Sequence, residues 1–266
     1  MNKALFIANI KSTYKIWIIF FLILFMYNSI TLSMFDPDST AEMQALYDMM
    51  PEAMMKAFGF SIFDPTLLGH MASFFYGFII ILFPLIYTIM LSYKLVAKYV
   101  DSGSMAFLLS SPNTRGKVII TQIITLLSSI ILLLLSVIAV GVTFSIILFS
   151  GLLDIGGYLL LNLGAILLYF AISGITFFCS TYFNEGKNAL MFGIGIPVGF
   201  FLVNMLRNVD EQLNFLRFFT IYTLYDNQLI LQNSSIIWFH FLALFAIGVI
   251  CYLLSIKIFK TKDLTL

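Results

Sequence analysis

Six long apolar stretches constrain what this chain can fold into, because none of them contains an aspartate, glutamate, lysine or arginine. A helix needs about 20 apolar residues to cross the hydrocarbon layer of a bilayer. The predicted spans cover residues 16–34, 71–93, 118–149, 156–181, 188–206 and 236–256. With 61% of its residues hydrophobic, a soluble chain of this size could not bury its apolar surface in one core. The sequence therefore predicts an all-α, polytopic membrane protein in which residues 1–266 form a single transmembrane domain.

The basic residues are distributed unevenly over the loops, and this sets the expected orientation. Lysine and arginine collect in the cytoplasmic loops of membrane proteins. If the N-terminus is cytoplasmic, 11 of the 14 basic residues lie on that side: Lys3, Lys11, Lys15, Lys94, Lys98, Arg115, Lys117, Lys187, Lys257, Lys260 and Lys262. Only Lys56, Arg207 and Arg217 then lie outside. We therefore expect a plasma-membrane protein with both termini in the cytoplasm.

The segment before the first span, residues 2–15, mixes basic and apolar residues. Lys3, Lys11 and Lys15 would give a helix here one basic side. Such a helix is either an interfacial helix on the inner leaflet or the ordinary basic flank of a span. The apolar run that follows is longer than the core of a signal peptide and lacks a small-residue cleavage site. We therefore expect this run to be retained as a membrane span.

The stretch between the first two spans, residues 42–59, has apolar residues at helical spacing, several of them methionine. This pattern predicts one or two short amphipathic helices on the outer side. Pro51 suits the first turn of a helix, and Gly59 suits the end of one. The segment either packs on the bundle or presents an adaptable methionine-rich face to a ligand.

The spans lack the side chains that would power transport. A carrier driven by protons or sodium usually has ionisable residues at membrane depth. His70 and His240 lie near span ends, where interfacial aromatic belts are expected. Gly116-Lys117 is followed by valine and Gly186-Lys187 by asparagine, so neither pair completes a phosphate-binding loop. Energy for transport would then have to come from another chain.

Composition argues against other function classes. The net charge of +1 provides no basic excess for binding nucleic acid. Cys179 and Cys251 have no partners at metal-binding or redox spacing, so we expect them to be buried thiols. Catalytic carboxylate pairs and nucleophile–histidine arrangements do not occur in the spans. We therefore expect a transport protein without enzymatic activity, metal or cofactor of its own.

The segment between the second and third spans, residues 94–117, is the most informative part of the chain. An apolar cluster, residues 105–109, lies between charged flanks, and a turn of serine, proline and asparagine follows it. Apolar residues left in water need a cover, which a groove on a partner protein would supply. The alternative is a turn tucked under the bundle itself.

This segment resembles the first cytoplasmic loop of the permease subunits of ABC-2 type ATP-binding-cassette (ABC) exporters. In that family the loop typically reads E-x-G-[ST]-x-x-x-L-L-[ST]-x-P-x-[ST]-R. The positions that match in order and spacing are Asp101, Gly103, Ser104, Leu108, Leu109, Ser110, Pro112, Thr114 and Arg115. Asp101 replaces the usual glutamate, and Gln122 stands where many relatives have lysine. The six-span architecture is similar to that family, a type V exporter-like fold, as well.

The resemblance implies a bacterial permease that pairs with a second permease, identical or related, and binds two ATPase subunits that carry ATP and Mg²⁺. The residues that it implies in coupling are Asp101, Gly103, Phe107, Leu108, Leu109, Pro112 and Arg115. The three apolar side chains would dock in a groove of the ATPase, the two charged ones would orient the segment, and the glycine and proline would shape its turns. The exported cargo would be amphipathic or hydrophobic, such as a peptide, an antibiotic or a lipid.

Two further sets of residues are candidates for smaller roles. Glu185 and Lys187, between the fourth and fifth spans, are a candidate second contact with the ATPase. The fifth span contains Gly193, Gly195, Pro197 and Gly199, which act either as a hinge or as a surface for close helix packing. By resemblance, this span is also a candidate for the contact between permeases.

Two other functions remain open from the sequence. A membrane scaffold or assembly factor would use the 94–117 segment to bind some other cytosolic protein without transporting anything. A secondary carrier would need a path of ionisable residues through the spans, which the sequence does not contain.

Overall fold

A computed structural model describes residues 1–37, 49, 51–59, 64–101 and 114–261. Within these residues six helices are long and apolar enough to cross a membrane, and no strand occurs. They are α1 (Lys3–Ser33), the composite helix Leu67–Val100, α8 (Arg115–Leu148), α9 (Ile155–Tyr182), α10 (Gly186–Val209) and α12 (Ile236–Thr261). The prediction of an all-α protein with six membrane-spanning helices is confirmed.

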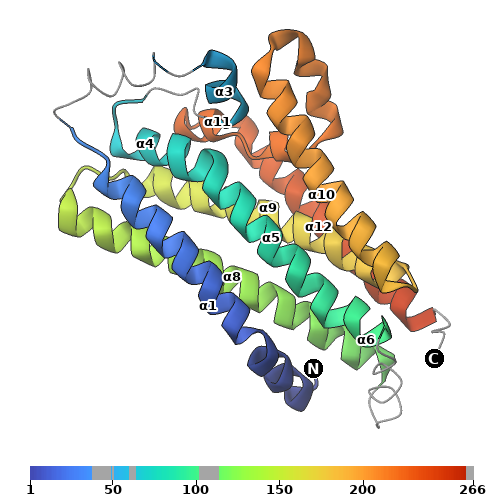
Figure 1. Ribbon diagram of the computed structural model, residues 1–266. Coiled ribbons are helices and arrows are strands. Elements are labelled where there is room, and N and C mark those ends of the chain that lie inside the picture. The colour runs from blue at the N-terminus through green and yellow to red at the C-terminus, as the bar shows by residue number, and fades with distance from the viewer. Residues whose placement is uncertain (38–48, 50, 60–63, 102–113, 262–266) are drawn as a thin grey trace.

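The six helices form one bundle with α9 at its centre (Figure 1). α9 packs against α12, α10, α8 and α5 (Ile80–Ser92), while α1 packs along α8. Both chain ends lie at the same end of the bundle, which we call the terminal end; the other is the opposite end. Large apolar side chains cover the outward faces, among them Leu22, Leu202 and Leu253. Such faces are stable against lipid, where an apolar side chain carries no solvation penalty.

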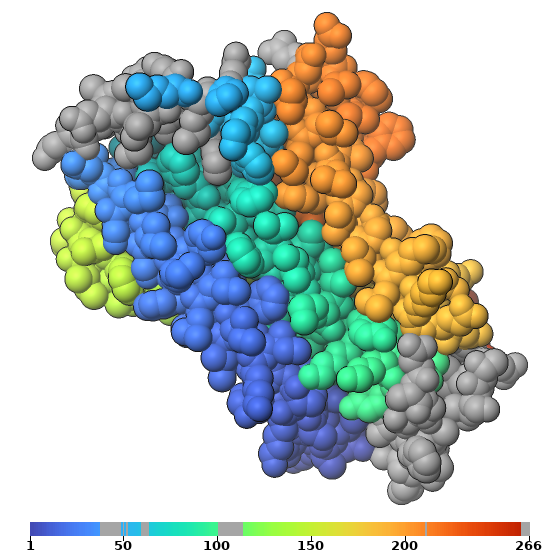
Figure 2. All heavy atoms as spheres, viewed as in Figure 1, coloured from blue at the N-terminus to red at the C-terminus, as the bar shows by residue number. Residues whose placement is uncertain are grey.

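Short elements cover the opposite end: α3 (Glu52–Ala57), η3 (Glu211–Phe219), η4 (Ile221–Leu224) and α11 (Asn227–Leu231). α10 and η3 project beyond the rest of the surface there (Figure 2). α3 follows Pro51, its N-cap, and packs against α10. Gly59 comes just after α3 with φ +76°, a conformation that favours glycine. Residues 42–48 and 50 of the predicted 42–59 stretch lie outside the described residues.

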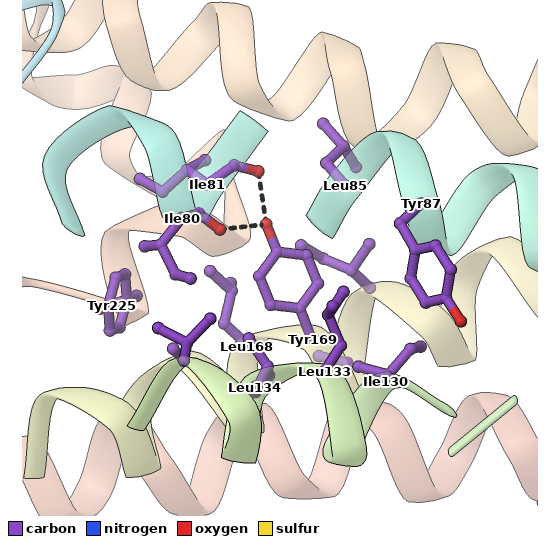
Figure 3. Close-up of a cluster of buried hydrophobic side chains, with 14 of the residues drawn as sticks. Ile80, Ile81, Leu85, Tyr87, Ile130, Leu133, Leu134, Leu168, Tyr169 and Tyr225 are labelled. Atoms are coloured by element: carbon purple, nitrogen blue, oxygen red, sulfur yellow. Dashed lines mark hydrogen bonds between the residues drawn. The ribbon is translucent and has the colours of Figure 1, made fainter. Parts of the chain in front are cut away.

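The second membrane-spanning helix is a chain of five consecutive helical pieces. They are α4 (Leu67–Phe74), the π-helical turn η1 (Phe75–Ile79), α5, the π-helical turn η2 (Tyr93–Ala97) and α6 (Lys98–Asp101). Pro84 lies inside α5 and has no N–H to donate to the carbonyl of Ile80, one turn earlier. The Tyr169 hydroxyl of α9 donates to that carbonyl oxygen at 2.9 Å and also contacts the carbonyl oxygen of Ile81 (Figure 3). A side chain from the central helix therefore satisfies the backbone group that the proline leaves unpaired.

Replacing Tyr169 with phenylalanine should lower the free energy of unfolding by about 1–3 kcal/mol, because the Ile80 carbonyl would be buried without a partner. Tyr222→Phe is the matched control. Burial raises the pKa of the Tyr222 hydroxyl, and that hydroxyl has no hydrogen-bond partner among the described residues. Thermal unfolding in detergent should show a lower midpoint for Tyr169→Phe and an unchanged or higher one for Tyr222→Phe. Equal midpoints would contradict the role given to Tyr169.

Candidate functional site

The structure describes the two ends of the predicted 94–117 coupling segment, residues 94–101 and 114–117. The second membrane-spanning helix continues through η2 and α6 to Asp101, well past the predicted span end at residue 93. α8 begins at Arg115, and the Thr114 side chain accepts a hydrogen bond from the backbone N–H of Lys117 at 3.3 Å, which caps the helix. Gly103, Phe107, Leu108, Leu109 and Pro112 fall in residues 102–113, outside the described residues. Both helix ends that lead into the segment lie at the terminal end.

A buried polar cluster joins three helices just inside this end. The Asn9 side chain donates to the Gln122 side-chain oxygen at 2.6 Å, which ties α1 to α8. The Tyr99 hydroxyl, on α6, reaches the Asn9 side-chain oxygen at 3.4 Å. Asn9 and Gln122 are fully buried, so these bonds form away from water, where breaking them leaves unpaired polar groups. The helices entering and leaving the coupling segment are therefore both anchored to α1.

The N-terminal segment belongs to this anchor. Residues 3–15 continue without a break into the first membrane-spanning helix. The backbone N–H of Asn2 donates to the Thr121 hydroxyl of α8 at 2.8 Å, and the Lys94 ammonium donates to the Ser12 carbonyl. Of the two alternatives from the sequence, a separate interfacial helix does not form: the segment lies along α8 instead.

The candidate second contact, Glu185 and Lys187, also lies at the terminal end. Glu185 is the residue before α10, and its carboxylate accepts a hydrogen bond from the Asn188 side chain at 3.0 Å. α10 contacts α6 near this point, so the candidate second contact and the end of the second membrane-spanning helix are neighbours. Ten of the described basic residues gather at this end: Lys3, Lys11, Lys15, Lys94, Lys98, Arg115, Lys117, Lys187, Lys257 and Lys260.

The candidate hinge residues lie in α10, which runs as one helix with Pro197 inside it. A Cβ added at Gly195 or Gly199 would meet nothing within 4 Å, and one at Gly193 would only touch Cys179 at 3.9 Å. Among the described residues, these glycines therefore make no close helix contact. Their role as a hinge, or as a packing surface towards another chain, stays a prediction.

His70 differs from the interfacial belt residue that the sequence suggested, whereas the prediction for His240 stays open. His70 is 5% exposed, and its Nε2 atom lies 3.0 Å from the carbonyl oxygen of Thr31, between the rings of Phe35 and Phe74. It thus ties α4 to the end of α1. His240 is partly buried, and its Nδ1 atom has no hydrogen-bond partner among the described residues.

The remaining candidate groups are the two cysteines and the side chains that could bind a metal ion. Cys179 is buried and Cys251 partly buried, and both are free thiols. Within the described ranges, no three histidine, cysteine, aspartate or glutamate side chains are close enough together to hold a metal ion.

A bundle with apolar sides, six membrane-spanning helices and a basic end defines a multi-pass membrane protein. The chain belongs to the ABC-2 family of transporters, because the family model described as ABC-2 family transporter protein matches residues 6–264. It is accordingly the membrane component of an ABC transporter, and the resemblance carried by residues 101–115 is confirmed at the level of the family. No curated protein and no solved structure matches the chain.

Proposed function

We propose that this chain is the permease of an exporter driven by a separate ATPase, which docks on the terminal end from the cytoplasm. The observation that carries the proposal is the terminal end itself. Ten described basic residues lie at this end. The last residue of α6 and the first residue of α8, which flank the 101–115 segment, lie there as well. Basic residues mark the cytoplasmic side of a membrane protein, which is the side where ATP is available.

The proposed coupling runs from the ATPase through residues 101–115 to the bundle. Phe107, Leu108 and Leu109 dock in a groove of the ATPase, and Asp101 and Arg115 orient the segment. Its other parts, Gly103 and Pro112, shape the turns, and Glu185 with Lys187 makes a second contact. ATP and Mg²⁺ bind to the ATPase, not to this chain.

The anchored helix ends support this transmission. Because Tyr99 and Gln122 are both tied to Asn9, a push on the segment moves the second membrane-spanning helix and α8 together with α1. Tyr169 then links α5 to the central helix α9. A rigid set of helices moves as a body, whereas loosely held ends would absorb the displacement.

The working assembly contains two permeases, identical or related, and two ATPase subunits in a bacterial plasma membrane. The sparsely covered face of α10 around Gly195 and Gly199 supports a contact with the second permease or a hinge in that helix. The cargo is amphipathic or hydrophobic, in line with the aromatic content of 17%.

Purification of the tagged chain from its native membranes in mild detergent tests this proposal. We expect a second chain with a phosphate-binding loop to purify with it and Mg²⁺-dependent ATP hydrolysis to accompany the complex. A tagged multi-pass protein of another family, expressed at the same level, is the control. If the tagged chain retains no more ATP-hydrolysing protein than this control, the proposal is wrong and a scaffold function is favoured.

A further inference from the structure

Two adjoining cavities lie at the opposite end, remote from the coupling segment. A small cavity of about 150 Å³ is lined mainly by polar side chains, including Asn204, Asn208 and Gln228. A larger one of about 490 Å³ has more apolar walls, to which Leu229 and Ile236 contribute. Both cavities are lined by Arg207, Thr223 and Asp226, so these three residues lie where the cavities meet.

Arg207 lies at this junction and has no partner in the part of the chain that the structure describes. It lies in the last turn of α10, is partly buried, and forms no hydrogen bond or ion pair with the described residues. Asp226 is the only carboxylate among the described lining residues, and it already caps α11 by accepting from the backbone N–H groups of Gln228 at 2.9 Å and Leu229 at 3.2 Å. Arg217, whose guanidinium lies 4.7 Å from the ring centre of Phe218, adds a second positive charge to the larger cavity.

The donors at the junction define the ligand group that they fit. A guanidinium presents five N–H donors in a planar fork that matches a carboxylate or a phosphate. Asn204 and Asn208 lie on α10 within one turn of Arg207 and line the same polar cavity, so their amides are placed to donate to the same ligand. The neighbouring apolar cavity has the volume of an ordinary small-molecule site and suits a hydrocarbon body.

Exposed aromatic side chains surround this site. Phe215, Phe218, Phe219, Trp238 and Phe239 are each more than half exposed. They flank the cavities, since they lie in η3 and in the first turn of α12. Tryptophan collects at the membrane–water interface, so Trp238 favours a position of this site near the lipid head groups.

We propose that the joined cavities bind a small anionic amphiphile, whose phosphate or carboxylate is held by Arg207 in the polar cavity and whose apolar body lies against Leu229 and Ile236. The ligand enters from the leaflet at the opposite end, which is the outer one if the proposed orientation holds. Binding itself needs neither the ATPase nor that orientation, so this inference and the proposed function can fail separately.

Native mass spectrometry of the purified full chain, titrated with dodecyl phosphate in neutral detergent, tests the proposal. We expect one saturable adduct, and binding at least tenfold weaker in Arg207→Gln. Arg207→Lys should be intermediate, because it keeps the charge but loses the fork. Lys257→Gln removes one positive charge from the terminal end and should bind like the unchanged chain.

Two further ligands and one further variant separate the parts of the proposal. Dodecylphosphocholine has the same tail with a zwitterionic head, and inorganic phosphate has no tail; both should bind at least tenfold more weakly than dodecyl phosphate. If dodecylphosphocholine binds as well as dodecyl phosphate, the site does not recognise the anionic head. If inorganic phosphate binds as well as dodecyl phosphate, the apolar cavity does not contribute to binding. Arg217→Gln serves if Arg207→Gln does not fold, and equal adducts in all folded variants would overturn the site.

Discussion

Replacing Leu108 and Leu109 together with aspartate should detach the proposed ATPase subunit from this chain and lower transport by about tenfold or more. The two leucines lie in the apolar cluster of residues 105–109, between the helix ends at Asp101 and Arg115. Burying an unpaired carboxylate in an apolar groove is far more costly than leaving it in water, so a charged segment would stay out of the groove. The measurement is the amount of ATPase that purifies with the tagged variant, followed by transport in vesicles.

The control is Leu152→Asp, which places one such carboxylate in the turn between α8 and α9 at the opposite end. Leu152 is 51% exposed, so the substitution should not disturb packing. It should retain the ATPase at the level of the unchanged chain. If the Leu108 and Leu109 variant also retains the ATPase, the docking surface lies elsewhere, and Glu185 with Lys187 becomes the next candidate for it.

Replacing Gly248 with valine should weaken the packing of α12 on the central helix α9. A Cβ at this position would lie 2.3 Å from a ring carbon of Phe170 and 3.1 Å from its carbonyl oxygen. The ring cannot easily turn away, since it is stacked on Phe245 and packed against Tyr252. Overpacking of this kind typically costs about 1–3 kcal/mol. Thermal unfolding in detergent should show a midpoint lowered by several degrees, with less monodisperse protein on gel filtration.

Gly199→Val is the control, because it makes the same substitution at a helical glycine with nothing within 4 Å. In the isolated chain it should fold with nearly the midpoint of the unchanged protein. If it folds but transports poorly, the hinge or the contact between permeases at α10 is supported. A Cβ added at Gly174 of α9 would lie 3.3 Å from the Cα of Gly248, so the two helices approach closely at this pair. Equal midpoints for the two valine variants would show that this approach does not limit packing.

The membrane fold could be predicted from sequence because lipid leaves few alternatives. Each predicted span lies mostly within one of the six helices, since an uncharged apolar stretch of this length must satisfy its own backbone hydrogen bonds in hydrocarbon. The second membrane-spanning helix continues past the end of its apolar stretch at residue 93 to Asp101. Hydropathy no longer limits a helix that enters the aqueous phase, and the spacing of Lys94, Lys98 and Asp101 near one helical turn indicates this continuation.

The candidate coupling segment was predictable in position, but its anchor was not. The loop motif and the charges locate residues 101–115, and Thr114 before Arg115 is a recognisable helix start. The cluster of Asn9, Tyr99 and Gln122 brings together residues from three distant parts of the chain. Each is a single polar residue beside an apolar run. This position is visible in the sequence, but it does not predict which hydrogen-bond partner each residue has in the folded chain.

His70 and Arg207 show the same difference. In the sequence both look like polar residues at the end of a span. His70 is buried against the end of α1, whereas Arg207 lies between two cavities without a partner among the described residues. Only the packing of the elements decides whether a polar side chain meets an acceptor or an open space.

The sequence by itself determined the fold class, the number of spans and the charge asymmetry between loops, because these follow from the transfer of side chains between water and lipid, residue by residue. The tertiary structure alone decided where helices touch at Gly174 and Gly248, how Tyr169 compensates for Pro84, and where cavities form. These depend on the relative placement of helices, and within hydrocarbon that placement is set by shape and individual hydrogen bonds rather than by hydrophobicity.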